Sequence, residues 1–298
     1  MKIAILSILL TLNAYALVLD NEYYPEDRQY NQNSPSDKGY TQYGTPSLFG
    51  KREFALTYDD GPHLINTPIL LDHLKKYEAK ATFFLVMERV GPKSVQLIKR
   101  MLDEGHIVGV HSMHHLNSNT MTREQFKADT KEALLKLNNA IKQTGHSLSE
   151  IFFRFPFAAY AENKNYHHLN VLRELSYELY QENCIQFVFW DHDSTDWIGD
   201  QMSPQEIFNN LKSFNEGGEY ITYKTIKGPK GTTFGKVYKN IQTPLQGGTI
   251  LMHDIHERTV KATEIYLEYA KNNGLKILPI SESAEYKPNE NVKCVLKN

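Results

Sequence analysis

From Arg52 onward, short apolar runs alternate with longer amphipathic segments, and this alternation constrains the fold more than any other feature of the chain. The apolar runs have the length and the aromatic and β-branched content of buried strands. The predicted strands are 54–58, 80–86, 106–110, 150–154, 186–190, 248–252 and 275–280, and the predicted helices are 67–77, 93–103, 122–143, 166–180, 203–214 and 258–273. Such alternation predicts parallel strands with helices outside, arranged as a barrel or a wound sheet.

One segment interrupts this rhythm before the sixth strand. Residues 216–240 contain five glycines together with several tyrosines and lysines, and they show no helical period. Aromatic and β-branched residues punctuated by glycine are typical of paired strands. We therefore predict a β-hairpin-like insertion between the sixth helix and the strand that follows it.

The two ends of the chain differ from its centre in composition and sequence pattern. Residues 1–16 carry Lys2, an apolar run and an Ala-Tyr-Ala cleavage site, which together predict a signal peptide cut near Ala16. The apolar run is shorter than a membrane span, and there is no lipid-anchor cysteine beside it, so we expect export to the periplasm or the cell exterior without a membrane anchor. Residues 17–51 are polar and are predicted to be a flexible arm, residues 52–283 the folded α/β domain, and residues 284–298 a tail.

Composition and cysteine content narrow the possible partners. The formal net charge is −2, so the overall basic character of a nucleic-acid-binding protein is absent. Only two cysteines occur, Cys184 and Cys294, which excludes a zinc site built from paired thiolates. In an oxidising compartment the two can form a disulfide, but the sequence leaves open whether they approach each other.

Ionisable residues follow five of the predicted strands. Their sequences are DDGP from residue 59, HSMHH from residue 111, RFPF from residue 154, DHDSTDW from residue 191 and HD from residue 253. In parallel α/β folds the chemistry takes place at the carboxyl ends of the strands. Each motif alone is common in ordinary turns and loops, but five on one rim predict an active site.

The residue types on this rim suit metal-assisted hydrolysis. One carboxylate and two imidazoles form a site with open positions for zinc or another divalent metal. Adjacent strand residues point in opposite directions, so Asp59 and Asp60 are expected to have different roles. A bound metal lowers the pKa of water to about 7, and a carboxylate base with a histidine acid completes an amide hydrolase.

These motifs, in this order, resemble the polysaccharide deacetylases of carbohydrate esterase family four, the group with NodB homology. TYDDGP, HSMHH, RFPF, DSTDW and LMH look like the five motifs of the family, and the similarity extends over roughly residues 52–281. The resemblance implies a distorted, incomplete (β/α)7-type barrel and a single metal ion, usually Zn²⁺ or alternatively another divalent metal such as Co²⁺.

The resemblance also assigns roles residue by residue. It implies that the metal ligands are Asp60, His111 and His115. Asp59 would be the general base and His253 the general acid, oriented by Arg154 and Asp193 respectively. The backbone N–H of Phe157 would stabilise the oxyanion, and Trp197 and Leu251 would line the acetyl pocket.

Three features depart from the family pattern. The insertion at residues 216–240 lengthens the usual link between the fourth and fifth motifs, and its tyrosines and lysines are expected to contact the polymer beside the cleft. Ala158 replaces a glycine that often follows the third motif, which can alter the oxyanion loop. His114, His192 and His256 are additional histidines, for which a surface position is favoured over a place behind the site.

The activity implied is removal of N-acetyl groups from a polymer that contains N-acetylglucosamine. Peptidoglycan is the first candidate substrate, and chitin and poly-N-acetylglucosamine remain open. Three alternatives also remain: an O-deacetylase acting on a substrate such as acetylated xylan, a sugar-binding protein without turnover, and a domain whose metal serves only folding.

Overall fold

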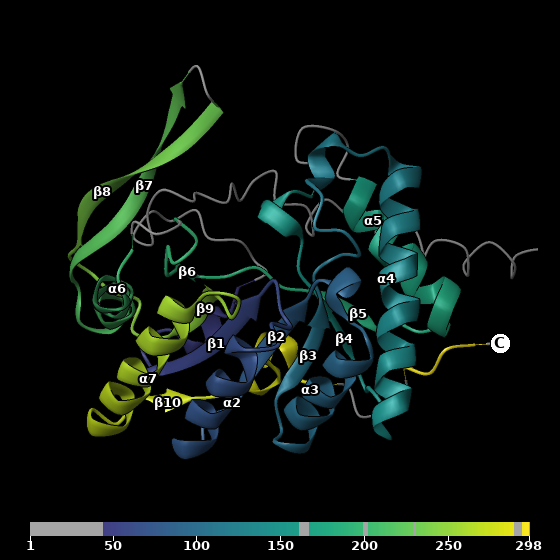
Figure 1. The fold of residues 1–298 in the computed structure, drawn as a ribbon, viewed down its shortest axis with the longest axis horizontal. Helices are drawn as coiled ribbons and strands as arrows, with labels where there is room; N and C mark the ends of the chain where they lie inside the picture. Colours follow the sequence, from purple (N-terminus) through teal and green to yellow (C-terminus); the bar gives the residue numbers. More distant parts are fainter. Residues whose placement is uncertain (1–43, 161–166, 199–201, 229–230, 289–293, 298) are drawn as a thin grey trace, which may run out of the picture.

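The computed structural model describes residues 44–160, 167–198, 202–228, 231–288 and 294–297. The predicted signal peptide and most of the predicted arm lie outside these residues. The predicted fold class is confirmed: a parallel sheet curls into a half-barrel with helices on its outside, and an antiparallel hairpin projects from one end (Figure 1).

Among the described residues the main sheet runs in the order β5-β4-β3-β2-β1-β9-β6, and β10 pairs with the start of β1. Every pairing in this sheet is parallel. The strands are β1 (Glu53–Asp59), β2 (Ala81–Leu85), β3 (Ile107–Val110), β4 (Ile151–Phe153), β5 (Ile185–Phe187), β6 (His192–Asp193), β9 (Gly248–His253) and β10 (Lys276–Ile277). All seven predicted strands are present, and the short β6 is an addition that the sequence pattern does not predict.

The helices form a continuous outer layer, in which each packs against its neighbours in the order α6-α7-α2-α3-α4-α5 (Figure 1). Their bounds are α2 (Asn66–Lys76), α3 (Pro92–Asp103), α4 (Arg123–Thr144), α5 (His167–Tyr180), α6 (Pro204–Glu216) and α7 (Glu257–Asn272). The two sharpest helix starts have capping boxes, in which Thr122 pairs with Gln125 and Ser203 with Glu206. The six predicted helices therefore agree with the structure to within two residues at each end.

Side chains alternate between the two faces of β1, so that one strand contributes residues to both the core and the site. Phe54, Leu56 and Tyr58 belong to the large core between the sheet and the helices, whereas Ala55 belongs to a smaller cluster on the inner side of the half-barrel. Because side chains alternate along a strand, Thr57 and Asp59 lie on the same inner side as Ala55. The inner face of β1 thus ends in a carboxylate at the carboxyl end of the sheet.

The last residues of the predicted arm pack against the domain. Leu48, in a short 3₁₀ turn at Pro46–Leu48, is buried. The backbone N–H and hydroxyl of Thr45 both donate to Asp191 Oδ2, at 3.0 and 2.8 Å. Hydrogen bonds to a buried carboxylate therefore hold a polar segment whose composition alone suggests a linker.

The predicted tail packs against the domain as well. Tyr286 is buried, and Cys294 forms a disulfide with Cys184, with the two Cα atoms 5.6 Å apart. The two cysteines, whose approach the sequence leaves open, are therefore paired. They meet because Cys184 directly precedes β5 and the tail returns to the edge of the sheet that β5 forms.

Removal of this disulfide is expected to destabilise the fold. It closes a loop of 110 residues, and bridges of that span constrain the unfolded chain by about 2–5 kcal/mol. A Cys184→Ser/Cys294→Ser variant should unfold at a lower urea concentration than the parent, and a reductant should lower the parent's midpoint to that of the variant. An unchanged midpoint after reduction of the parent would contradict the prediction.

The predicted hairpin is confirmed as β7 (Gly218–Gly228) and β8 (Gly231–Ile241), paired antiparallel along their length. It follows α6 and extends beyond the carboxyl end of the sheet (Figure 1). None of the helices in the described part of the chain combines the length and apolarity that a membrane span needs.

Candidate metal and catalytic site

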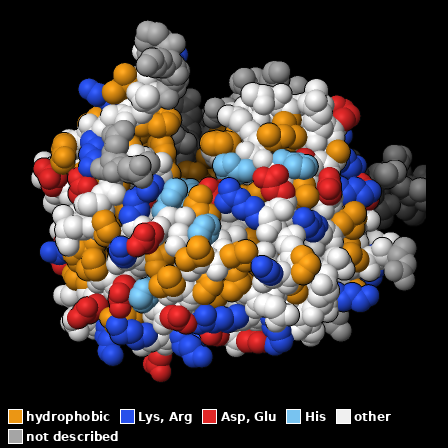
Figure 2. Space-filling view, in the orientation of Figure 1, with side chains coloured by type: hydrophobic (Ala, Val, Ile, Leu, Met, Phe, Trp, Pro, Cys, Tyr) orange, Lys and Arg blue, Asp and Glu red, His pale blue; other side chains and the backbone are white. Residues whose placement is uncertain are grey.

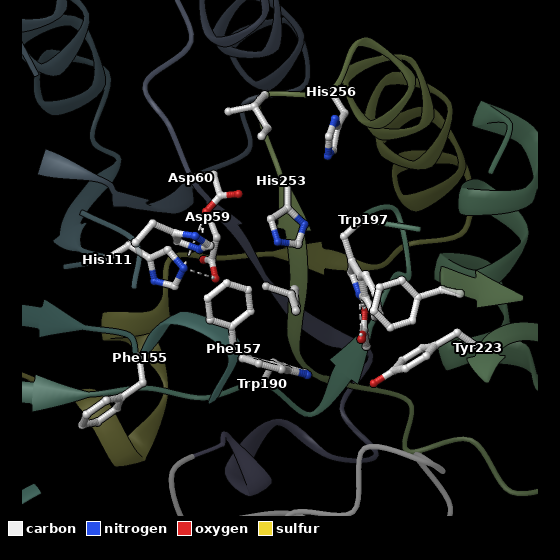
Figure 3. A pocket seen from close by; sticks show the side chains of 15 residues that line it. Asp59, Asp60, His111, Phe155, Phe157, Trp190, Trp197, Tyr223, His253 and His256 are labelled. Atoms are coloured by element: carbon white, nitrogen blue, oxygen red, sulfur yellow. Dashed lines mark hydrogen bonds and ion pairs between the residues drawn. The ribbon is translucent and has the colours of Figure 1, made fainter. Parts of the chain in front are cut away.

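The site lies where neighbouring parallel strands end. β3, β2, β1 and β9 are consecutive in the sheet, so the residues after β3 and at the ends of β1 and β9 meet at one edge. Histidine side chains are visible in and beside a notch on this part of the surface, next to hydrophobic side chains (Figure 2). Figure 3 shows Asp59, Asp60 and His111 on one side of a pocket, with His253 beside them.

The three predicted metal ligands converge. Asp60 Oδ1 lies 3.1 Å from His115 Nε2 and 3.7 Å from His111 Nε2, and one ligand atom from each of the three residues lies within 4.8 Å of the others. Within the described residues, Asp60 Oδ1 is buried without a hydrogen-bond partner. A buried carboxylate oxygen that faces two imidazoles fits the donor set of a divalent transition metal.

Protonation states in this cluster favour metal binding. His111 Nδ1 lies 2.9 Å from the carbonyl oxygen of Arg154, so the Nδ1–H group donates a hydrogen bond to this oxygen. The lone pair of Nε2 then faces Asp60. Burial lowers the pKa of His111, which favours the neutral form that binds metals. Burial opposes ionisation of Asp60, but contact with His115 and the nearby imidazoles hold the pKa of its carboxyl well below its usual range.

The backbone around this cluster is unusual. Asp60, Ser112 and His115 all have positive φ, at 72°, 67° and 53°. Non-glycine residues in this region each cost on the order of 1–3 kcal/mol and concentrate at functional sites. These turns redirect the chain immediately after the strands, which is how His115 reaches Asp60 from a loop.

Asp59 points to the inner side of the half-barrel and pairs with Arg154. Arg154 Nη1 donates to Asp59 Oδ1 at 2.8 Å and to Thr57 Oγ1 at 2.7 Å. The remaining guanidinium donors bind the carbonyls of Val188 and Phe189, and the guanidinium lies 4.1 Å from the centroid of the Phe84 ring. Because Arg154 is fully buried and each of its three guanidinium nitrogens donates a hydrogen bond, it fixes the orientation of Asp59.

The partner of His253 is Asp196, which corrects the assignment of this role to Asp193. His253 Nδ1 donates to Asp196 Oδ1 at 2.8 Å. Asp196 Oδ2 accepts from the backbone N–H of His253 at 2.7 Å and from Thr259 Oγ1 at 2.6 Å. Burial opposes protonation of His253, but the Asp196 carboxylate raises the pKa of the ring to about 10.

The strand register explains the correction. Asp193 pairs with Leu251, two residues before His253 on β9. The chain then turns at Thr195, where φ is 58°, and this turn carries Asp196 to the level of His253.

Asp193 has a different set of contacts. Its carboxylate accepts from the indole Nε1 of Trp197 at 3.1 Å and from the backbone N–H of Thr195 at 2.7 Å. Burial raises the pKa of Asp193 to about 6. This residue therefore holds Trp197 in place at the pocket wall.

A pocket of about 460 Å³ unites the site. Nine of the ten predicted site residues line it, namely Asp59, Asp60, His111, His115, Phe157, Asp193, Trp197, Leu251 and His253, and Arg154 lies behind Asp59. Six other residues complete the lining: Phe155, Trp190, Tyr223, Phe234, Ile255 and His256. None of these six is predicted from the sequence to line the pocket, although the tyrosines of the glycine-rich insertion, Tyr223 among them, are expected to contact the substrate. His256 stands three residues after His253, and Phe234 lies in the same insertion.

The loop after β4 reaches the pocket in a strained conformation. Phe157 and Ala158 have φ of 58° and 52°, and the Phe157 ring lies 4.7 Å from that of His115. Glycine adopts positive φ without strain, so Ala158 holds this conformation of the loop after β4 at a cost on the order of 1 kcal/mol.

The additional histidines occupy three environments. His192 is buried and stacks on Phe214 with ring centroids 4.3 Å apart, so the surface position favoured for it is wrong. His114 is exposed and pairs with Asp129 at 2.8 Å. His256 lines the pocket, with its ring 6.2 Å from that of His253.

Residues 48–180 match the model of the polysaccharide deacetylase family. This part of the chain is similar to that family. The match begins just before β1 and ends with α5, so it contains the Asp60, His111 and His115 cluster together with Arg154.

Curated proteins extend the match along the chain. The chain is 31% identical over 189 residues to a peptidoglycan-N-acetylglucosamine deacetylase of Bacillus cereus, covering 62% of this chain and 60% of the relative. A second protein of that name from the same organism is 26% identical over 254 residues, covering 84% of this chain and 95% of the relative. The chain thus spans less than two thirds of the first relative and nearly all of the second.

A solved structure supports the fold. A family 4 acetyl xylan esterase from Clostridium thermocellum, in complex with a cobalt ion, superposes with a TM-score of 0.54 at 22% identity. The match covers 77% of this chain and 89% of that structure.

Proposed function

We propose that this chain is an exported, metal-dependent hydrolase that removes N-acetyl groups from an N-acetylglucosamine-containing polysaccharide. Peptidoglycan is the first candidate substrate and chitin-like oligomers are the second. The observation that carries the proposal is that the Asp60–His111–His115 cluster lies beside Asp59 and His253 in one pocket. The names of the B. cereus relatives support peptidoglycan as the polymer.

Asp60, His111 and His115 would hold the metal, with Zn²⁺ or Co²⁺ the expected ions. A metal at this position polarises the acetamide carbonyl and lowers the pKa of water. Asp59, held by Arg154, takes the proton of the attacking water. His253, kept protonated by Asp196, gives a proton to the leaving amine, so that acetate and a free amino sugar are formed.

The remaining pocket residues would position the acetyl group. The backbone N–H of Phe157 is the proposed donor to the oxyanion that develops on the carbonyl oxygen. Trp197 and Leu251 lie on the pocket wall and would contact the acetyl methyl group. Both are held in place, Trp197 by Asp193 and Leu251 by its position in β9.

Metal removal tests the proposal. The chain from residue 17 onward is treated with a chelator and then reloaded with Zn²⁺ or Co²⁺, and acetate release is measured from peptidoglycan, a chitin hexamer and acetylated xylan. We expect release from an N-acetylated polymer to fall to background on chelation and to return on reloading, while the circular dichroism spectrum stays that of a folded protein.

Each other outcome identifies a rival. Release from acetylated xylan alone would indicate an O-deacetylase, and loss of the folded spectrum on chelation would indicate a structural metal. No release from any polymer by the folded, metal-loaded protein would reject the enzymatic proposal in favour of sugar binding.

A further inference from the structure

The hairpin, which the half-barrel itself does not require, reaches the catalytic pocket. Tyr223 on β7 and Phe234 on β8 both line the pocket and pack on Trp197, with ring centroids 4.5 and 5.1 Å from the indole. Tyr223 and Phe234 also contact each other edge-to-face, at 5.6 Å. Figure 3 shows Trp197 and Tyr223 across the pocket from Asp59 and His111.

The hairpin register places both rings on one face. Tyr223 lies opposite Lys236 and Thr225 lies opposite Phe234, and residues two apart on a strand share a face. Lys236 Nζ pairs with Glu206 Oε1 of α6 at 2.6 Å. The hairpin face with the two aromatic rings therefore also carries the lysine that joins the hairpin to α6 by an ion pair.

The base of the hairpin is tied to the loop that carries the catalytic partner Asp196. The carbonyl of Ile221 accepts from Thr195 Oγ1 at 3.0 Å and from Asn210 Nδ2 at 2.8 Å, and the Ile221 N–H donates to Asn210 Oδ1 at 2.7 Å. Ile221 and Asn210 are buried. Buried, satisfied hydrogen bonds of this kind fix Tyr223, two residues further along β7, relative to Trp197.

We propose that Tyr223 and Phe234 are specificity-determining residues that, with Trp197, form an aromatic wall against which the sugar ring bearing the acetyl group packs. A pyranose ring presents C–H groups on its face, and aromatic side chains with a large rigid surface bind such faces at low entropic cost. The wall stands across the pocket from the metal cluster, so a ring packed on it is held with its acetamide toward Asp59. This inference rests on the proposed function, because it names what the hairpin adds to that same pocket.

The test uses two readouts on the metal-loaded chain. Trp190 and Trp197 are the two tryptophans of the sequence and both line the pocket, so tryptophan fluorescence reports binding of an N-acetylated chitin hexamer independently of turnover. The second readout compares deacetylation of the hexamer with hydrolysis of p-nitrophenyl acetate, which has no sugar ring.

We expect Tyr223→Ala and Phe234→Ala each to weaken hexamer binding about five- to tenfold and to raise KM for the hexamer by a similar factor, with a smaller change in p-nitrophenyl acetate hydrolysis. Tyr223→Phe should restore binding because it keeps the ring. Tyr238→Ala is the matched control, since Tyr238 is 58% exposed on the same hairpin and does not line this pocket.

Two results would overturn the inference. Unchanged hexamer binding in both alanine variants would show that the wall does not touch the sugar. An equal loss on hexamer and on p-nitrophenyl acetate would show that the rings only support Trp197. If the parent binds the hexamer without releasing acetate, the fluorescence assay still tests the wall while the proposed activity fails.

Discussion

Asp59→Asn is expected to lower acetate release by about 10²–10⁴-fold while leaving the fold intact, since a positioned general base contributes about that factor. The amide oxygen of the substituted side chain can still accept from Arg154 Nη1, which donates to Asp59 Oδ1 at 2.8 Å, so the buried guanidinium keeps its partner. The variant loses only the ability to take a proton from water. Acetate release under saturating metal, with thermal melting as the check on folding, measures the effect.

The matched control for this prediction replaces Arg154, the ion-pair partner of Asp59. Arg154→Met leaves the Asp59 carboxylate buried without its cation, and unpaired buried charges cost about 3–5 kcal/mol. We therefore expect Arg154→Met to lower the melting temperature more than Asp59→Asn, because the asparagine amide oxygen still accepts a hydrogen bond from the buried guanidinium, while both variants lose activity. Substantial turnover by a folded, metal-loaded Asp59→Asn protein would assign the base to another group.

The fold could be predicted from the sequence because each element has a local signal. Strand runs such as 54–58 and capped helices such as that beginning at Ser203 specify their own structure, and strict alternation then leaves few topologies. β6 could not be predicted, because His192 and Asp193 form a strand only by pairing with β9. The packing of Thr45 likewise depends on Asp191, which lies far along the chain.

The candidate site could be predicted as a set of residues but not as a set of contacts. Strand ends identify Asp59, Asp60, His111 and His253, because parallel strands must end together. Contacts made after a turn depend on backbone conformation that residue types do not reveal. The positive φ of Thr195 decides which aspartate of DSTDW reaches His253. The position of the insertion before the last motif suggests contact with the substrate, but the sequence does not show which of its aromatic residues reach the pocket.

The two aspartates of this motif give the second large prediction. Asp196→Asn removes the carboxylate that accepts from His253 Nδ1 at 2.8 Å and favours the protonated ring. Loss of the equivalent carboxylate in a serine protease triad lowers kcat about 10⁴-fold, so we expect a loss of about 10²–10⁴-fold here. Asp193→Asn keeps an acceptor for the Trp197 indole, so we expect a loss below about tenfold.

The pH profile separates an effect on His253 from a general loss of structure. A general acid must be protonated, so activity falls as pH rises through its pKa. Asp196 raises the pKa of His253, and therefore the alkaline limb of kcat should move to lower pH in Asp196→Asn and stay in place in Asp193→Asn. If instead Asp193→Asn moved that limb and Asp196→Asn did not, the partner of His253 during turnover would be Asp193, and the loop after β6 would have to rearrange when substrate binds.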